Sequence, residues 1–145
     1  MARMRLLILA GVACMAAVGL LPTRVDAQAA AQSLGSVTIS KKVMANGQPL
    51  AAGTYTVRLS ADTVSAVVGQ SADSEKWVEF VQGGQVKGKE LATVVGSADV
   101  KTVSKEKPPA AGTSRVDLLK GADYLRVWIN KGGTHYLIHL TLATS

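Results

Sequence analysis

The chain has 145 residues, a length that suits a single domain able to bury a sizeable core. Its formal net charge is +6, but the basic residues are scattered and lack the interleaved aromatic side chains of a nucleic-acid-binding motif. One cysteine in the whole chain excludes a disulfide-stapled scaffold, and the scattered positive charge disfavours nucleic acid as a partner.

The first 27 residues have the three parts of a secretory signal peptide. Arg3 and Arg5 precede an apolar run over residues 6–21, and Val25-Asp26-Ala27 supplies a small-x-Ala exit. The apolar run is shorter than the ~20 residues that a membrane-spanning helix needs. We therefore expect cleavage after Ala27 and export of a mature chain that begins at Gln28, to the periplasm or out of the cell.

Cys14 offers an alternative, because lipoproteins are cleaved before a cysteine that then carries lipid. Such signals usually have Leu three residues earlier, where this chain has Gly11, and here the apolar run continues past the cysteine. Ordinary cleavage is therefore favoured. It leaves 118 residues without cysteine and a net charge of +4, which is compatible with weak attraction to anionic polysaccharide or lipid head groups.

After a polar segment over residues 28–35, expected to be a flexible tail, strand patterns recur along the chain. Alternating or β-branched runs cover residues 36–43, 53–60, 63–68, 77–81, 86–95 and both halves of 124–142. Turn signals separate several of them, namely Asn46-Gly47, Gly83-Gly84 and Gly132-Gly133. The sequence predicts one all-β domain over residues 36–145, an antiparallel β-sandwich or small barrel of seven to eight short strands.

The last hairpin has the best-defined register. A two-residue turn at Gly132-Gly133 places Lys131 opposite Thr134 and sorts the side chains into two faces. The predicted inward row is Leu125, Val127, Ile129, Tyr136, Ile138 and Leu140. The other face then carries the pairs Asn130/His135, Trp128/Leu137 and Arg126/His139.

Residues 96–114 form the longest stretch without a regular pattern. The segment Pro108-Pro109-Ala110-Ala111-Gly112 is unsuited to strand pairing. We expect either a mobile surface loop or a link between two halves of the sheet, and a mild effect of deleting residues 108–112. A loose basic cluster, Lys101, Lys105 and Lys107, lies in the same stretch.

The segment Pro49-Leu50-Ala51-Ala52-Gly53-Thr54-Tyr55-Thr56-Val57 resembles the P-x-G-x-Y-x-V hairpin entry of carboxypeptidase-regulatory-like and transthyretin-like secreted β domains. Those domains usually have proline before the glycine, where this chain has Ala52. The resemblance covers about ten residues and implies a sandwich fold and a non-catalytic accessory role. From the residues alone, Tyr55 is expected to face inward with a polar tip.

Three chemical motifs are incomplete. Residues 83–90 approach a phosphate-binding loop but end in Glu90 where a hydroxyl is needed, so a Gly-Gly hairpin is favoured over nucleotide binding. His135 and His139 lie about 13 Å apart on one strand face, too far to share a metal unaided. Ser71 lacks the second glycine and the strand-turn-helix context of the G-x-S-x-G motif that carries a catalytic serine. We therefore expect no metal site, no cofactor and no catalytic residue, with a small secreted hydrolase as an alternative.

One face of the last hairpin carries the candidate binding residues, Tyr124, Arg126, Trp128, His135 and His139. If this face is open, it forms an aromatic and basic platform on which sugars stack, with an arginine for carboxylated glycans. If the domain covers it, Trp128 is buried. The sequence favours a non-catalytic binding or structural module, with envelope polysaccharide or another exported protein as its partner. The first alternative is a carbohydrate- or envelope-binding domain that uses this aromatic and basic face. It does not fix the oligomeric state.

Overall fold

The computed structural model describes residues 32–65, 68–69, 71 and 73–144. The predicted signal peptide and residues 28–31 lie outside the described residues. In chain order the elements are β1 (Ser33–Ile39), β2 (Val43–Ala45), β3 (Gln48–Leu50), β4 (Gly53–Leu59), β5 (Glu75–Gln82), β6 (Gln85–Gly96), α1 (Val100–Val103), β7 (Ser114–Leu118), β8 (Tyr124–Lys131) and β9 (Thr134–Leu142). The predicted all-β class is confirmed. Within the described ranges, no helix has the length and apolarity needed to cross a membrane.

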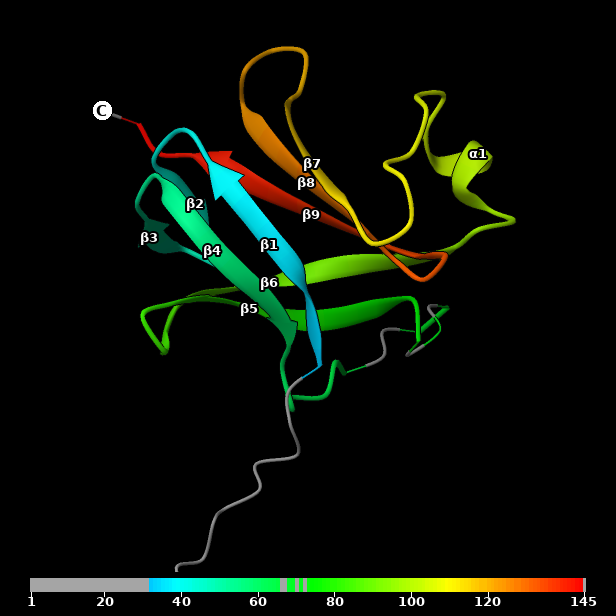
Figure 1. The fold of residues 1–145 in the computed structure, drawn as a ribbon, viewed down its shortest axis with the longest axis horizontal. Helices are drawn as coiled ribbons and strands as arrows, with labels where there is room; N and C mark the ends of the chain where they lie inside the picture. Colours follow the sequence, from blue (N-terminus) through cyan, green and yellow to red (C-terminus); the bar gives the residue numbers. More distant parts are fainter. Residues whose placement is uncertain (1–31, 66–67, 70, 72, 145) are drawn as a thin grey trace, which may run out of the picture.

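The strands form one antiparallel, nearly closed sheet with a barrel-like shape (Figure 1). Around the ring the order is β1, β4, β5, β6, β9, β8 and β7. The Ser114 hydroxyl in β7 donates a hydrogen bond of 2.9 Å to the Ser36 carbonyl in β1, which brings the two ends of the ring together. The short β2–β3 hairpin pairs with the end of β9, beyond the residues of β9 that pair with β6.

The predicted register of the C-terminal hairpin is confirmed at every pair. Lys131 lies opposite Thr134, and the pairing continues through Trp128 with Leu137 to Leu125 with Leu140. Gly132 and Gly133 have φ values of 60° and 91°, a backbone that side-chain-bearing residues rarely adopt. Because the side-chain period of a strand is two, this turn places every inward residue of both strands on the core side.

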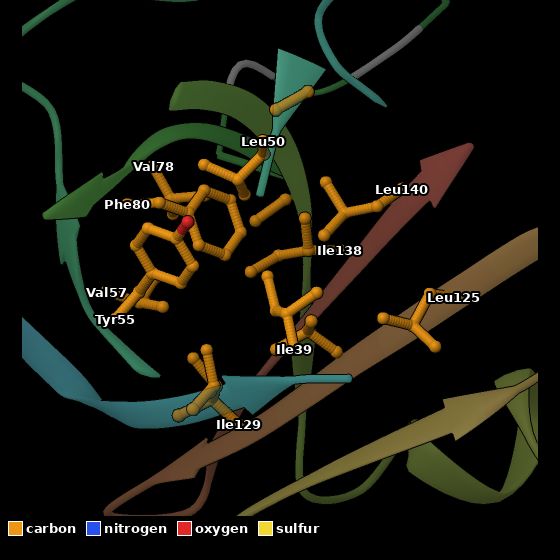
Figure 2. Close-up of a cluster of buried hydrophobic side chains, with 14 of the residues drawn as sticks. Ile39, Leu50, Tyr55, Val57, Val78, Phe80, Leu125, Ile129, Ile138 and Leu140 are labelled. Carbon is orange, nitrogen blue, oxygen red and sulfur yellow. The ribbon is translucent and has the colours of Figure 1, made fainter. Parts of the chain in front are cut away.

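The inside of the ring is packed with apolar side chains from most strands (Figure 2). Tyr55 meets Phe80 edge to face, with ring centroids 6.2 Å apart, and its hydroxyl donates a hydrogen bond of 2.6 Å to the Ala51 carbonyl. Tyr55 therefore faces inward as expected, and its polar tip is hydrogen-bonded. The other large buried members of this core include Ile39, Leu50, Val57, Val78, Leu125, Ile129, Ile138 and Leu140.

Two predicted boundaries are wrong. The flexible tail was expected to reach residue 35, but β1 begins at Ser33, and Gly35 pairs with Val57 of β4. Leu34 is buried in the core, which explains why this end is held. The run over residues 63–68 was expected to form a strand, yet Thr63 to Ser65 are not in one, because β4 pairs directly with β5 and no adjacent edge is left for another strand.

The irregular stretch after β6 is neither free nor a link between sheets. Residues 97–113, hereafter the strap, include α1 and lie beside one end of β7, β8 and β9 before turning into β7 (Figure 1). The strap begins with a hydrogen bond from the Ser97 hydroxyl to the Gly133 carbonyl. It ends where the Gly112 amide donates to the Asn130 carbonyl at 2.8 Å and the Asn130 amide donates to the Thr113 carbonyl at 3.0 Å.

Candidate functional site

Trp128 is the centre of the outer face of the C-terminal hairpin. It points away from the core, as its register requires, but it is only 1% exposed. Val100 of α1 covers it, together with Val95 and Leu137, in a second apolar cluster outside the ring. The open platform proposed from the sequence is therefore absent, and the buried alternative is the one found. Local periodicity does not reveal this cover, because it comes from the strap.

The indole of Trp128 is also held by polar contacts. Its Nε1 donates a hydrogen bond of 3.0 Å to Nδ1 of His135, a residue that is 3% exposed. Neutral His135 therefore carries its proton on Nε2. Burial lowers the pKa of His135 below its ordinary value, which favours the neutral ring that can accept this bond.

Two arginines and two carboxylates form a network beside the indole. The guanidinium carbons of Arg115 and Arg126 lie 5.3 and 5.1 Å from the centre of the Trp128 ring. Asp117, the partner of Arg126 across β7 and β8, accepts bonds from both arginines at 2.7 and 3.3 Å. Glu106 of the strap accepts from both at 2.9 and 2.6 Å. The charges of these four side chains cancel.

The same arginines and a buried amide attach the strap to the sheet. Arg115 donates a hydrogen bond of 2.8 Å to the Lys107 carbonyl. The side chain of Asn130, 7% exposed, donates to the Pro109 carbonyl and accepts from the Gly133 amide, both at 2.9 Å. These bonds fasten an otherwise irregular segment over the indole.

Residues of the strap line a hollow of about 490 Å³. Its lining is mixed: Val100 and Pro108 are apolar, Ser104 is polar, and three exposed lysines outnumber one acidic residue, Glu106. Those lysines, Lys101, Lys105 and Lys107, form no ion pair within the described residues. The loose basic cluster noted in the sequence is thus gathered around one hollow, where its positive potential attracts an anion.

A second hollow, of about 380 Å³, lies beside the connection between β4 and β5. Asp62, Asp73 and Glu75 line it, and Lys76, the one lysine among its described lining residues, pairs with Asp73 at 3.5 Å. The local charge there is negative, so the hollow on the strap is the better candidate for an anionic ligand.

The five residues expected to form the platform have different surroundings. Arg126 and His135 are buried with Trp128, whereas Tyr124, 47% exposed, and His139 lie at the surface beyond the strap's cover. Loss of hydration, and after it the positive charge of Arg126, lowers the pKa of His139. Among the described residues, no group of three or more His, Cys, Asp or Glu side chains is arranged to hold a metal ion.

Arg115, Asp117 and Glu106 were not predicted as site residues. The pair in β7 has a recognisable signal, since alternate charged residues on a strand share a face, but their partners lie on other elements. In comparisons with known proteins, no protein family, curated protein or solved structure matches this chain.

Proposed function

We propose that this chain is an exported, non-catalytic binding module that takes an anionic ligand in the hollow of its strap. The observation that carries the proposal is the gathering of Lys101, Lys105 and Lys107 around one hollow on a segment fastened to the sheet; none of the three forms an ion pair with another described residue. A fixed segment loses little conformational entropy when a ligand binds, so modest contacts yield measurable affinity. Export rests on the signal peptide predicted over residues 1–27.

The lysines are exposed, so the affinity they supply is sensitive to salt. Charges in water are screened over about 8 Å at physiological ionic strength. We therefore expect binding of micromolar to millimolar strength that weakens as salt is added.

The two alternatives raised by the sequence fit the geometry less well. A sugar cannot stack on Trp128 while the strap covers it, so glycan binding through that platform requires the strap to leave. A hydrolase would use a serine with His135 or His139 as base. The Nδ1 of His135 already accepts the Trp128 hydrogen bond, and His139 forms no hydrogen bond with a serine among the described residues.

The test is calorimetric titration of the mature chain with oligogalacturonate and with dextran sulfate, at low and at physiological salt. The triple variant Lys101→Ala, Lys105→Ala, Lys107→Ala should lose at least about tenfold in affinity. The matched control removes the same charge from exposed lysines elsewhere, namely Lys41→Ala, Lys42→Ala, Lys87→Ala. Equal losses in both triples would mean unspecific charge attraction and would reject this site.

Export is tested separately. N-terminal sequencing of the protein recovered outside the cytoplasm should begin at Gln28. A chain that stays in the cytoplasm with residues 1–27 intact would contradict export.

A further inference from the structure

Glu106 belongs both to the hollow on the strap and to the charge network beneath it. Its carboxylate bonds Arg115 and Arg126, yet the side chain is 61% exposed. Asp117 bonds the same two guanidiniums, but it comes from β7 and is 30% exposed. Of the two carboxylates, Glu106 is the one that a ligand in the hollow meets directly and that can swing into water.

Arg126 has a donor that Glu106 does not use. Its Nε is buried and has no hydrogen-bond partner within the described residues, while its Nη2 donates to both Glu106 and Asp117. A buried donor without an acceptor is costly. A carboxylate approaching the guanidinium side-on bonds Nε and Nη2 together, the bidentate arrangement that arginine favours.

We infer that Glu106 is an internal stand-in for a carboxylate of the ligand, and that the ligand is an acidic polysaccharide containing uronic acids. One ligand carboxylate displaces Glu106 and pairs with Arg115 and Arg126, and Lys101, Lys105 and Lys107 pair with its neighbours along the chain. This inference rests on the proposed function. It adds the ligand class and the residue that the ligand must displace.

The lining of the hollow favours a polysaccharide over an acidic peptide. Extended peptides are commonly recognised by main-chain pairing with a free strand edge. Here the lining comes from α1 and residues 104–108, which lie outside every strand, and Pro108 has no amide hydrogen. Recognition therefore depends on side chains, which suits charged groups repeated along a sugar chain.

The experiment uses the mature chain with Trp77→Phe, so that Trp128 is its one tryptophan. Since both guanidiniums lie against the Trp128 ring, displacement of Glu106 changes its fluorescence. We expect Glu106→Gln to raise the affinity for oligogalacturonate at least about fivefold, a coupling of ordinary size. Asp117→Asn is the matched control, with the same change of charge and a smaller gain. Arg115→Lys keeps the positive charge but loses the paired N–H donors of the guanidinium, so it should weaken binding about fivefold.

Each remaining outcome is decisive. Equal gains in Glu106→Gln and Asp117→Asn would reduce the effect to net charge and overturn the displacement. Binding that needs the three lysines but ignores Glu106 and Arg115 would overturn the displacement and leave the proposed function standing. Binding that is insensitive to the three lysine substitutions would contradict both the displacement of Glu106 and the proposed function. Equally tight binding of oligoglutamate, with the same dependence on Glu106, would assign the site to acidic peptides and overturn the polysaccharide.

Discussion

Trp128 and His135 are joined across the C-terminal hairpin by a hydrogen bond of 3.0 Å between Nε1 and Nδ1, beneath the strap. Protonation of His135 would place a hydrogen on Nδ1 and break this bond. Because burial lowers the pKa of His135, the unfolded chain takes up a proton at a higher pH than the folded chain does.

The free energy of unfolding should therefore fall as the pH drops below about 6.5, the ordinary histidine value. The stabilising contribution of neutral His135 to the free energy of unfolding is complete above that pH, and it is lost as the pH falls through the lowered pKa of the folded state. Urea unfolding between about pH 7.5 and 5 measures the slope. His139 adds to it in the same direction, so His135→Asn should reduce the slope without abolishing it. An unchanged slope in His135→Asn would contradict the assignment.

The C-terminal hairpin should dominate the stability of the core. Ile138 is fully buried, and its truncation to alanine should cost about 2–5 kcal/mol in the free energy of unfolding. Thr141→Ala, at an exposed position on the same strand, should cost under about 0.5 kcal/mol. Chemical denaturation compares the two variants, and a neutral Ile138→Ala would show that the inward row is misplaced.

Removal of residues 108–112 should destabilise the protein, contrary to the expectation from sequence. The deletion takes away the Pro109 carbonyl and the Gly112 amide that pair with Asn130. A buried polar group left without a partner costs about 1–3 kcal/mol. Thermal unfolding should show the loss in the deletion and also in Asn130→Ala, with Ala111→Ser as a surface control. A deletion as stable as the parent chain would mean that the strap is not fastened there.

Two tyrosines provide a matched comparison of a buried and an exposed hydroxyl. Tyr55→Phe removes the hydrogen bond to the Ala51 carbonyl and leaves that acceptor unpaired, which should cost about 0.5–1.5 kcal/mol. Tyr124→Phe changes an exposed ring and should have little effect. Unfolding midpoints that shift equally in the two variants would argue against a specific role for the Tyr55 hydroxyl.

Local patterns predicted the parts of this fold that local physics determines. The Gly132-Gly133 turn and the alternation around it specified every pair of the last hairpin, and Tyr55 was correctly placed inside. The strap was missed because its contacts join Glu106 and Pro109 to strand residues about 20 positions away. Such contacts leave no trace in periodicity. For the same reason, the sequence left open whether the face around Trp128 is covered.

Ligand binding at the strap is tested most directly by a chemical-shift map of the ¹⁵N-labelled mature chain titrated with oligogalacturonate. If the ligand enters the hollow on the strap and displaces Glu106, the largest shifts occur at the amides of residues 100–108 and at the indole Nε1–H of Trp128, with little change at residues 53–59 of β4 across the ring. Shifts centred elsewhere on the sheet, or a Trp128 indole signal that does not move while the rest of the protein binds, would contradict it.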